Sequence, residues 1–154
     1  MNYDPFYISN KMSVSLEYCL EDCQTFEEFE SRFSDEFLMD DARVGNYLER
    51  LMWKYDKDYA TISRLAGLDR SYVGNIIRGK KNNPSRDALI AICLAAGTDV
   101  EEVQYLLKCA GHAPLYVRRK RDVIIWFGFM KHRTIDEVDR DLYEHGYKTF
   151  IKAE

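Results

Sequence analysis

The chain has 154 residues, of which 46% are hydrophobic and only three are proline, and this composition is typical of a globular, mostly helical protein. Its length allows one well-cored domain with an appended subdomain, and excludes two large independent ones. The formal net charge is −4. Neither a run of about 18 apolar residues nor a signal-peptide pattern occurs, so we expect a cytoplasmic protein without membrane contact.

Charge divides the chain into two parts. Residues 1–58 carry 14 acidic and 6 basic side chains, whereas residues 59–154 carry 12 acidic and 16 basic ones. A polyanion would therefore be repelled by the first part.

Residues 1–40 indicate an acidic extension that is partly helical. Thr25 and Glu28 have the spacing of a capping box, and phenylalanine recurs on one helical face at positions 26, 29 and 33. Asp40 or Asp41 can cap the next helix. The inner stripe of that helix consists of Val44, Leu48, Leu51, Met52 and Tyr55.

Residues 59–86 have the pattern of two short helices joined by a tight turn. Ile62 and Leu65 give the first helix an inner face. Gly67 follows where the chain must turn, because glycine adopts a left-handed backbone without strain. Asp69 can accept hydrogen bonds from the first amides of the second helix. The inner face of that helix carries Tyr72, Val73 and Ile76, and Gly79 ends it.

The outward face of this second helix carries side chains suited to reading DNA bases. Arginine pairs bidentately with guanine and asparagine with adenine, and serine can donate or accept. From Arg64 to Asp87 six basic residues stand against two acidic ones, a local balance of +4, which suits contacts with phosphates. The expected outward residues are Arg70, Ser71, Gly74, Asn75 and Arg78.

This segment resembles the phage-repressor-like (Xre/Cro type) helix-turn-helix transcriptional regulators, and the resemblance runs from about Val44 to Val103. It implies a lambda-repressor-like helical bundle that inserts the helix at residues 70–78 into the major groove. The base-reading positions then fall on Arg70, Ser71 and Asn75. Contacts with the DNA backbone are expected from Tyr59, Thr61, Arg78, Lys80, Lys81 and Asn82.

Two positions depart from the family pattern. Tyr59 stands where the family often has glutamine, and Ile77 stands where it often has glutamate before the final Arg-Gly. The isoleucine suggests an extra apolar contact under the reading helix.

A weak internal repeat begins at the end of this segment. Residues 86–115 match residues 121–150 without gaps at an offset of 35. Each copy predicts a helix, a turn with an N-cap at Asp99 or Thr134, a second helix and a closing glycine. Two copies are too few for a solenoid, so we expect the second to form a helical hairpin stacked on the first.

The first helix of the second copy is apolar nearly all round, with the sequence VIIWFGFM at residues 123–130. Such a helix must be covered on more than one side. The acidic N-terminal helices could cover it, and so could a twin subunit.

Four consecutive basic residues precede that helix. A charge run of this kind is usually a solvated face or a helix start, and the alternative is a second patch that contacts phosphates. It consists of Arg118, Arg119, Lys120 and Arg121.

Catalysis and metal binding are not expected. The three histidines are scattered, and neither a glycine-rich phosphate loop nor a nucleophile elbow occurs. Asp139 and Asp141 are expected on a charged outer face. Cys93 and Cys109 lie on apolar stripes and predict buried free thiols, whereas Cys19 and Cys23, one helical turn apart, lack further metal ligands. The sequence therefore predicts no enzyme, no metal and no cofactor.

Together these patterns predict an all-α protein with three parts: an acidic extension at 1–40, a helix-turn-helix DNA-binding domain at 41–112, and a C-terminal helical hairpin at 113–154 for packing or dimerisation. The expected function is that of a sequence-specific regulator of transcription bound to double-stranded DNA, with two subunits on paired half-sites. The alternative is a protein-interaction adaptor or antitoxin-like partner that uses the same helices to bind a protein.

Overall fold

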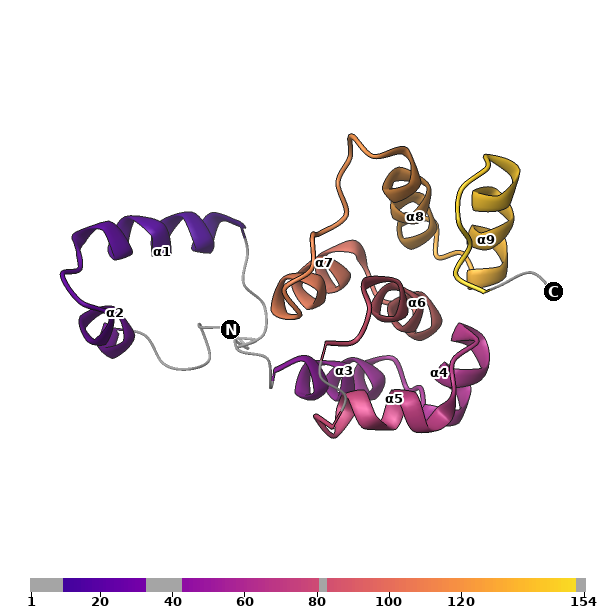
Figure 1. The fold of residues 1–154 in the computed structure, drawn as a ribbon, viewed down its shortest axis with the longest axis horizontal. Coiled ribbons are helices and arrows are strands. Elements are labelled where there is room, and N and C mark those ends of the chain that lie inside the picture. The colour runs from indigo at the N-terminus through magenta and orange to yellow at the C-terminus, as the bar shows by residue number, and fades with distance from the viewer. Residues whose placement is uncertain (1–9, 33–42, 81–82, 152–154) are drawn as a thin grey trace. The chain divides into compact units, whose positions relative to one another are not determined.

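A computed structural model describes residues 10–32, 43–80 and 83–151 (Figure 1). These residues form nine α-helices and no strand, so the prediction of an all-α protein is confirmed for the described part of the chain. The chain divides into two compact units, Met1–Asp40 and Asp41–Glu154. The predicted capping residues Asp40 and Asp41, and Phe33, lie outside the described residues.

The first unit contains helices α1 (Asn10–Asp22) and α2 (Phe26–Arg32). Thr25 caps α2 as expected, because its hydroxyl oxygen accepts a hydrogen bond from the Glu28 amide at 3.1 Å. The returning bond of the predicted capping box is shifted by one residue, since the Glu28 carboxylate accepts from the Gln24 amide. Phe26 is 64% exposed.

The second unit begins with α3 (Arg43–Lys54), α4 (Tyr59–Ala66) and α5 (Arg70–Ile77), followed by α6 (Arg86–Ala96) and α7 (Val100–Cys109). The inner stripe predicted for α3 is confirmed for its four helical members, which are all buried. Tyr55 differs, because it lies beyond the end of α3 and is half-buried. Helix α6 is the central element, buried from Ala88 to Ala96, and packs against α4 and α7.

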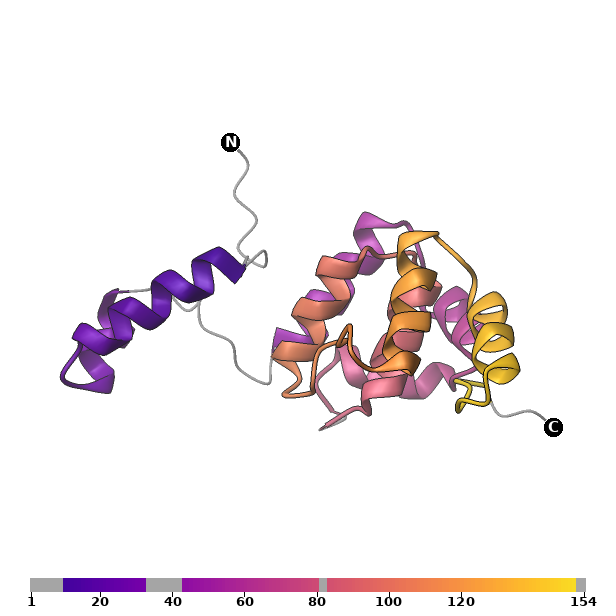
Figure 2. The ribbon, with the colours of Figure 1, turned by 90° about the horizontal axis from the view of Figure 1, so that it is seen from above.

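The second unit ends with α8 (Lys120–Met130) and α9 (Ile135–Glu144), which form an antiparallel hairpin (Figure 2). The predicted repeat is visible in its capping. Asp99 begins α7 and Thr134 begins α9, each with a complete capping box. Gly111 and Gly146 follow these helices with φ of +75° and +78°. The hairpin geometry read from the 35-residue offset is therefore confirmed.

The two hairpins are held together by reciprocal ion pairs. Arg86 of the first donates two hydrogen bonds to Asp122 of the second, at 3.2 and 3.0 Å. Arg121 of the second donates two to Asp87 of the first, at 3.0 and 3.1 Å. Arg86 and Arg121 are equivalent at the offset of 35, and so are Asp87 and Asp122. The hairpins are therefore related by an approximate two-fold axis.

The helix packing follows the same reciprocity. Helix α6 packs against α9, and α7 packs against α8, so the first helix of each hairpin meets the second helix of the other. The close approach within the second hairpin requires glycine at position 128, where an added Cβ would lie 2.5 Å from a methyl group of Val138.

After each hairpin the chain folds back and is tied to the second helix at equivalent positions. The Gln104 side chain pairs with both the amide and the carbonyl of Leu115, at 2.7 and 2.9 Å. The Asp139 carboxylate accepts from the amides of Phe150 and Ile151 at 2.7 and 3.0 Å. Asp139 therefore has a structural role, which corrects its expected place on a charged outer face.

Candidate nucleic-acid interface

Helices α4 and α5 are joined by a three-residue turn that begins at Gly67. The glycine has φ of +66°, in the left-handed region that the sequence predicted. Its amide bonds the carbonyl of Ser63 and so closes α4. An added Cβ at Gly67 would lie 3.0 Å from Cγ1 of Ile151, because the C-terminal segment packs on this turn. The turn is thus supported by residues distant in the sequence.

Asp69 starts α5 as predicted. One carboxylate oxygen accepts hydrogen bonds from the Ser71 amide at 2.9 Å and from the Ser71 hydroxyl at 2.8 Å. These bonds, first that from the hydroxyl and then that from the amide, lower the pKa of Asp69. Because its proton is donated to Asp69, the Ser71 oxygen presents lone pairs to solvent.

The buried face of α5 consists of Val73, Gly74, Ile76 and Ile77. Ile77 is 8% exposed, in agreement with the apolar contact expected there. Its carbonyl lies against α3, where a Cβ added to Gly45 would be 2.4 Å from the Ile77 oxygen. Helix α5 is therefore fixed against α3 along this face.

The opposite face of α5 carries the polar residues. Arg70, Ser71 and Arg78 are exposed and Asn75 is half-buried. The Arg78 guanidinium donates to the Asn75 side-chain oxygen at 3.1 Å, which leaves the Asn75 amino group directed elsewhere. Gly74 was expected outward and is buried instead. The Arg78 guanidinium covers it, at 3.1 Å from where a Cβ of residue 74 would lie. The structure thus brings the four polar residues onto one surface.

The N-terminus of α4 carries Tyr59 and Thr61, which the sequence predicted to contact the DNA backbone. The Asp58 carboxylate accepts from the Thr61 amide at 2.8 Å, and this bond, with one to the Thr61 side chain, lowers the pKa of Asp58. Tyr59 and Thr61 are half-buried. Leu65 was expected on the inner face and is 36% exposed, because it borders an open cavity of about 290 Å³ between α4, α6, α8 and α9.

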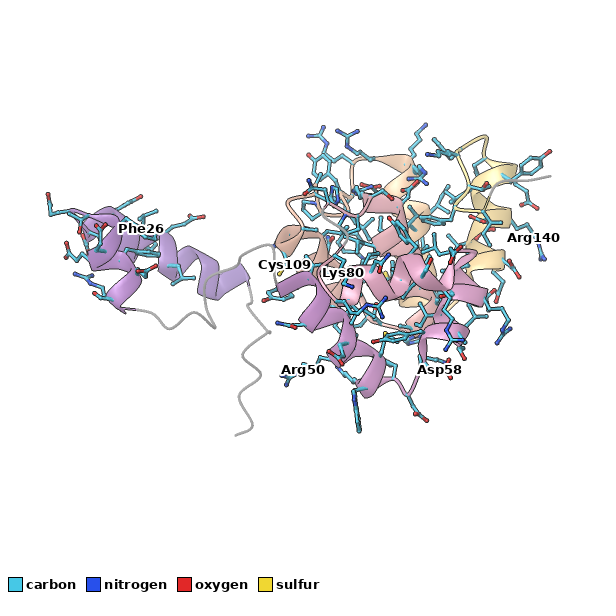
Figure 3. The ribbon with its side chains drawn as sticks, turned by 60° about the horizontal axis from the view of Figure 1, so that its bottom comes forward. Phe26, Arg50, Asp58, Lys80, Cys109 and Arg140 are labelled. Atoms are coloured by element: carbon cyan, nitrogen blue, oxygen red, sulfur yellow. The ribbon has the colours of Figure 1, made fainter. Side chains whose placement is uncertain are left out.

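The segment after α5 carries part of the expected basic loop. Lys80 is exposed (Figure 3). Lys81 and Asn82 lie outside the described residues. Asn83 has φ of +57°, and the carbonyl of the buried Pro84 lies 2.7 Å from Nε2 of His112. The loop is therefore anchored at its end by the first hairpin, a contact that no local pattern indicated.

The basic run before α8 is divided by its contacts. Arg118, Arg119 and Lys120 are exposed, whereas Arg121 is half-buried. Besides Asp87, Arg121 bonds the carbonyl of Lys148 at 3.1 Å and lies 5.2 Å from the centre of the Phe150 ring. Only the first three residues present their charge to solvent.

A partly buried network joins the end of α3 to α7. The Glu102 carboxylate accepts from Lys54 at 2.8 Å and from the Tyr55 hydroxyl, and it also bonds the Asp99 amide at 3.0 Å. Burial favours a higher pKa for Glu102, but the backbone bond at Asp99 and the bonds from Lys54 and Tyr55 outweigh it and lower the pKa. Burial, followed by the Glu102 bond, raises the pKa of Tyr55.

Among the described residues, no group of three or more histidine, cysteine, aspartate or glutamate side chains could hold a metal ion. The expected burial of Cys93 and Cys109 as free thiols is confirmed. None of the described helices has the length and apolar character needed to cross a membrane.

The chain matches no protein-family model, no curated protein and no solved structure.

Proposed function

We propose that this protein is a sequence-specific double-stranded DNA-binding regulator of the phage-repressor-like helix-turn-helix class. Helices α4 and α5 are its helix-turn-helix, and α5 enters the major groove. The observation that carries the proposal is the exposed polar face of α5, with Arg70, Ser71, Asn75 and Arg78 on a helix whose other face is buried.

The chemistry of this face fits direct readout. Arg70 stands at the first position of α5, where the recognition helix of this motif meets base edges. The Arg78 bond orients Asn75, whose amide group suits adenine. In this proposal the exposed Lys80 and the start of α4 contact phosphates, which fix the register of the protein on the duplex.

Selection of bound sequences from a random DNA pool by the full-length protein tests the proposal. We expect one enriched motif. Arg70→Ala should then weaken binding to that motif by about 5- to 150-fold, equivalent to about 1–3 kcal/mol, and relax specificity at one position. Lys80→Ala should weaken binding to selected and random DNA alike and reduce the slope of log K against log salt by about 1.

Arg50→Ala is the matched control, because Arg50 is an exposed arginine of α3 outside the α4–α5 surface (Figure 3). It removes the same charge and should leave both affinities unchanged. The proposal fails if no motif is enriched, or if Arg70→Ala and Arg50→Ala have equal effects.

A second candidate is an adaptor that binds another protein. It is favoured by the exposure of Phe127 at 49% and Met130 at 53% on α8. An adaptor without DNA binding would give no enriched motif in the same selection.

A further inference from the structure

The outer side of α8 is left uncovered where its counterpart in the first hairpin is covered. Phe127 and Met130 are 49% and 53% exposed, whereas their equivalents at the 35-residue offset, Ile92 and Ala95, are 1% and 7% exposed. The difference arises because α4 packs on α6 and no other helix of the second unit, Asp41–Glu154, takes the corresponding place on α8. Within the second unit, Phe127 and Met130 therefore form an uncovered apolar surface, the kind of surface at which proteins associate.

The charges around this surface indicate which partner fits. On α8, Lys120, Ile124, Phe127 and Lys131 recur at spacings of three and four residues and share one face. Both lysines are exposed, so this face is apolar in the middle and basic at each end. Two such faces laid on each other would oppose lysine to lysine, which is unfavourable.

Helix α9 presents the complementary face. Glu137, Arg140 and Glu144 recur at the same spacing and are all exposed. Gly128 meets Val138 in the antiparallel hairpin (Figure 2). Both helices advance by the same rise per residue, in opposite directions from that contact. Lys120 therefore lies near the level of Glu144 along the hairpin, and Lys131 near the level of Glu137. The handedness of the helices places both faces on the same side of the hairpin.

We infer that this face of α8 and α9 binds a second copy of the same chain, with α8 of each copy packed against α9 of the other. A two-fold axis parallel to the helices sets Lys120 against the second copy's Glu144, and Lys131 against its Glu137. Phe127 then meets the second copy's Arg140, and each such contact occurs twice. Within one chain, the first helix of each hairpin already packs against the second helix of the other. The dimer has the same arrangement, formed by the outer faces of α8 and α9.

The dimer itself does not depend on the proposed DNA-binding function. Its consequence for the geometry of DNA binding does rest on that function. Figure 1 shows α5 and α8 on opposite sides of α6. A second copy docked on α8 and α9 carries its own α5 on the far side of the interface. The pair would therefore hold two separate duplexes rather than neighbouring half-sites on one.

Charge exchange in the full-length protein tests the interface without DNA. Sedimentation velocity at low salt should show the wild type as a dimer at about 100 μM, since a face of two short helices gives a weak interface. Lys120→Glu and Glu144→Lys should each weaken dimerisation at least about tenfold, because each opposes like charges. An equimolar mixture of the two variants should dimerise again, since each supplies the charge that the other needs.

Glu49→Lys, on the exposed side of α3, is the control and should dimerise like the wild type. Circular dichroism establishes that the variants are folded. A monomeric wild type under these conditions, two variants that dimerise normally, or a mixture that stays monomeric would each overturn the inference. An acidic helix of the same chain covering α8 would give the first of these results. DNA selection with Glu144→Lys reports separately on the proposed function, which survives if that variant still enriches the motif.

Discussion

Replacing Gly128 by alanine should destabilise the second unit, although alanine is the better helix former. The new Cβ would lie 2.5 Å from a methyl group of Val138, against about 3.5–4.0 Å for an ordinary carbon contact. Val138 is fully buried and β-branched, so it cannot rotate away. Overpacking costs about 1–3 kcal/mol, and a contact this short against a fully buried neighbour belongs at the upper end, about 2–3 kcal/mol. The gain in helix propensity returns about 1 kcal/mol.

The expected net loss is therefore about 1–2 kcal/mol, or a decrease in Tm of about 5–10 °C, measured by thermal and urea unfolding followed by circular dichroism. Gly74→Ala is the matched control. Gly74 is also inside a helix, but its added Cβ would meet only the flexible end of Arg78, at 3.1 Å. That variant should be as stable as the wild type or more stable. If Gly128→Ala proved equally harmless, the close packing of α8 on α9 would be wrong.

Two further predictions follow from buried ionisable groups. The pKa of Glu102 in the folded protein lies below its ordinary value of 4.5, so its charged form adds stability above pH 4.5 that is lost as pH falls through the folded value. Unfolding free energies measured down the acid range should fall less steeply for Glu102→Gln, and equal slopes would contradict the assigned network with Lys54. Burial raises the pKa of the Cys93 thiol to about 12. Iodoacetamide should therefore label half-exposed Cys23 well before Cys93 in the native protein, and equal labelling by peptide mass spectrometry would show that Cys93 is accessible.

The sequence predicted best what depends on neighbouring residues. The offset of 35 identified equivalent caps at Asp99 and Thr134, because a capping box is completed within four residues. It also paired Arg86 with Arg121 as equivalents. It did not indicate that each arginine bonds the aspartate of the other hairpin, because that choice depends on how the hairpins approach.

The same limit applies to the surface of α5. Helical periodicity placed Arg70 and Ser71 on the outside, but it also placed Gly74 there, because spacing alone cannot show that the long Arg78 side chain folds over its neighbour. The contact of Ile151 with the turn at Gly67 joins residues more than half the chain apart. No periodic pattern could indicate it.

The reciprocal ion pairs have a consequence for how this duplicated region tolerates change. Asp122 is 3% exposed and accepts both Arg86 bonds, so losing either partner leaves the other largely withdrawn from water without its counter-charge. Deleting the second hairpin would leave Arg86 and Asp87 both without their ion-pair partners. The two ion pairs therefore make the hairpins depend on each other for folding. Insertions are best accommodated at the exposed residues Val117 and Arg118, because the Tyr116 amide before them bonds Asp122 and Arg119 after them begins α8. A recombination that exchanged one hairpin alone would have to preserve both charges of the copy it left behind.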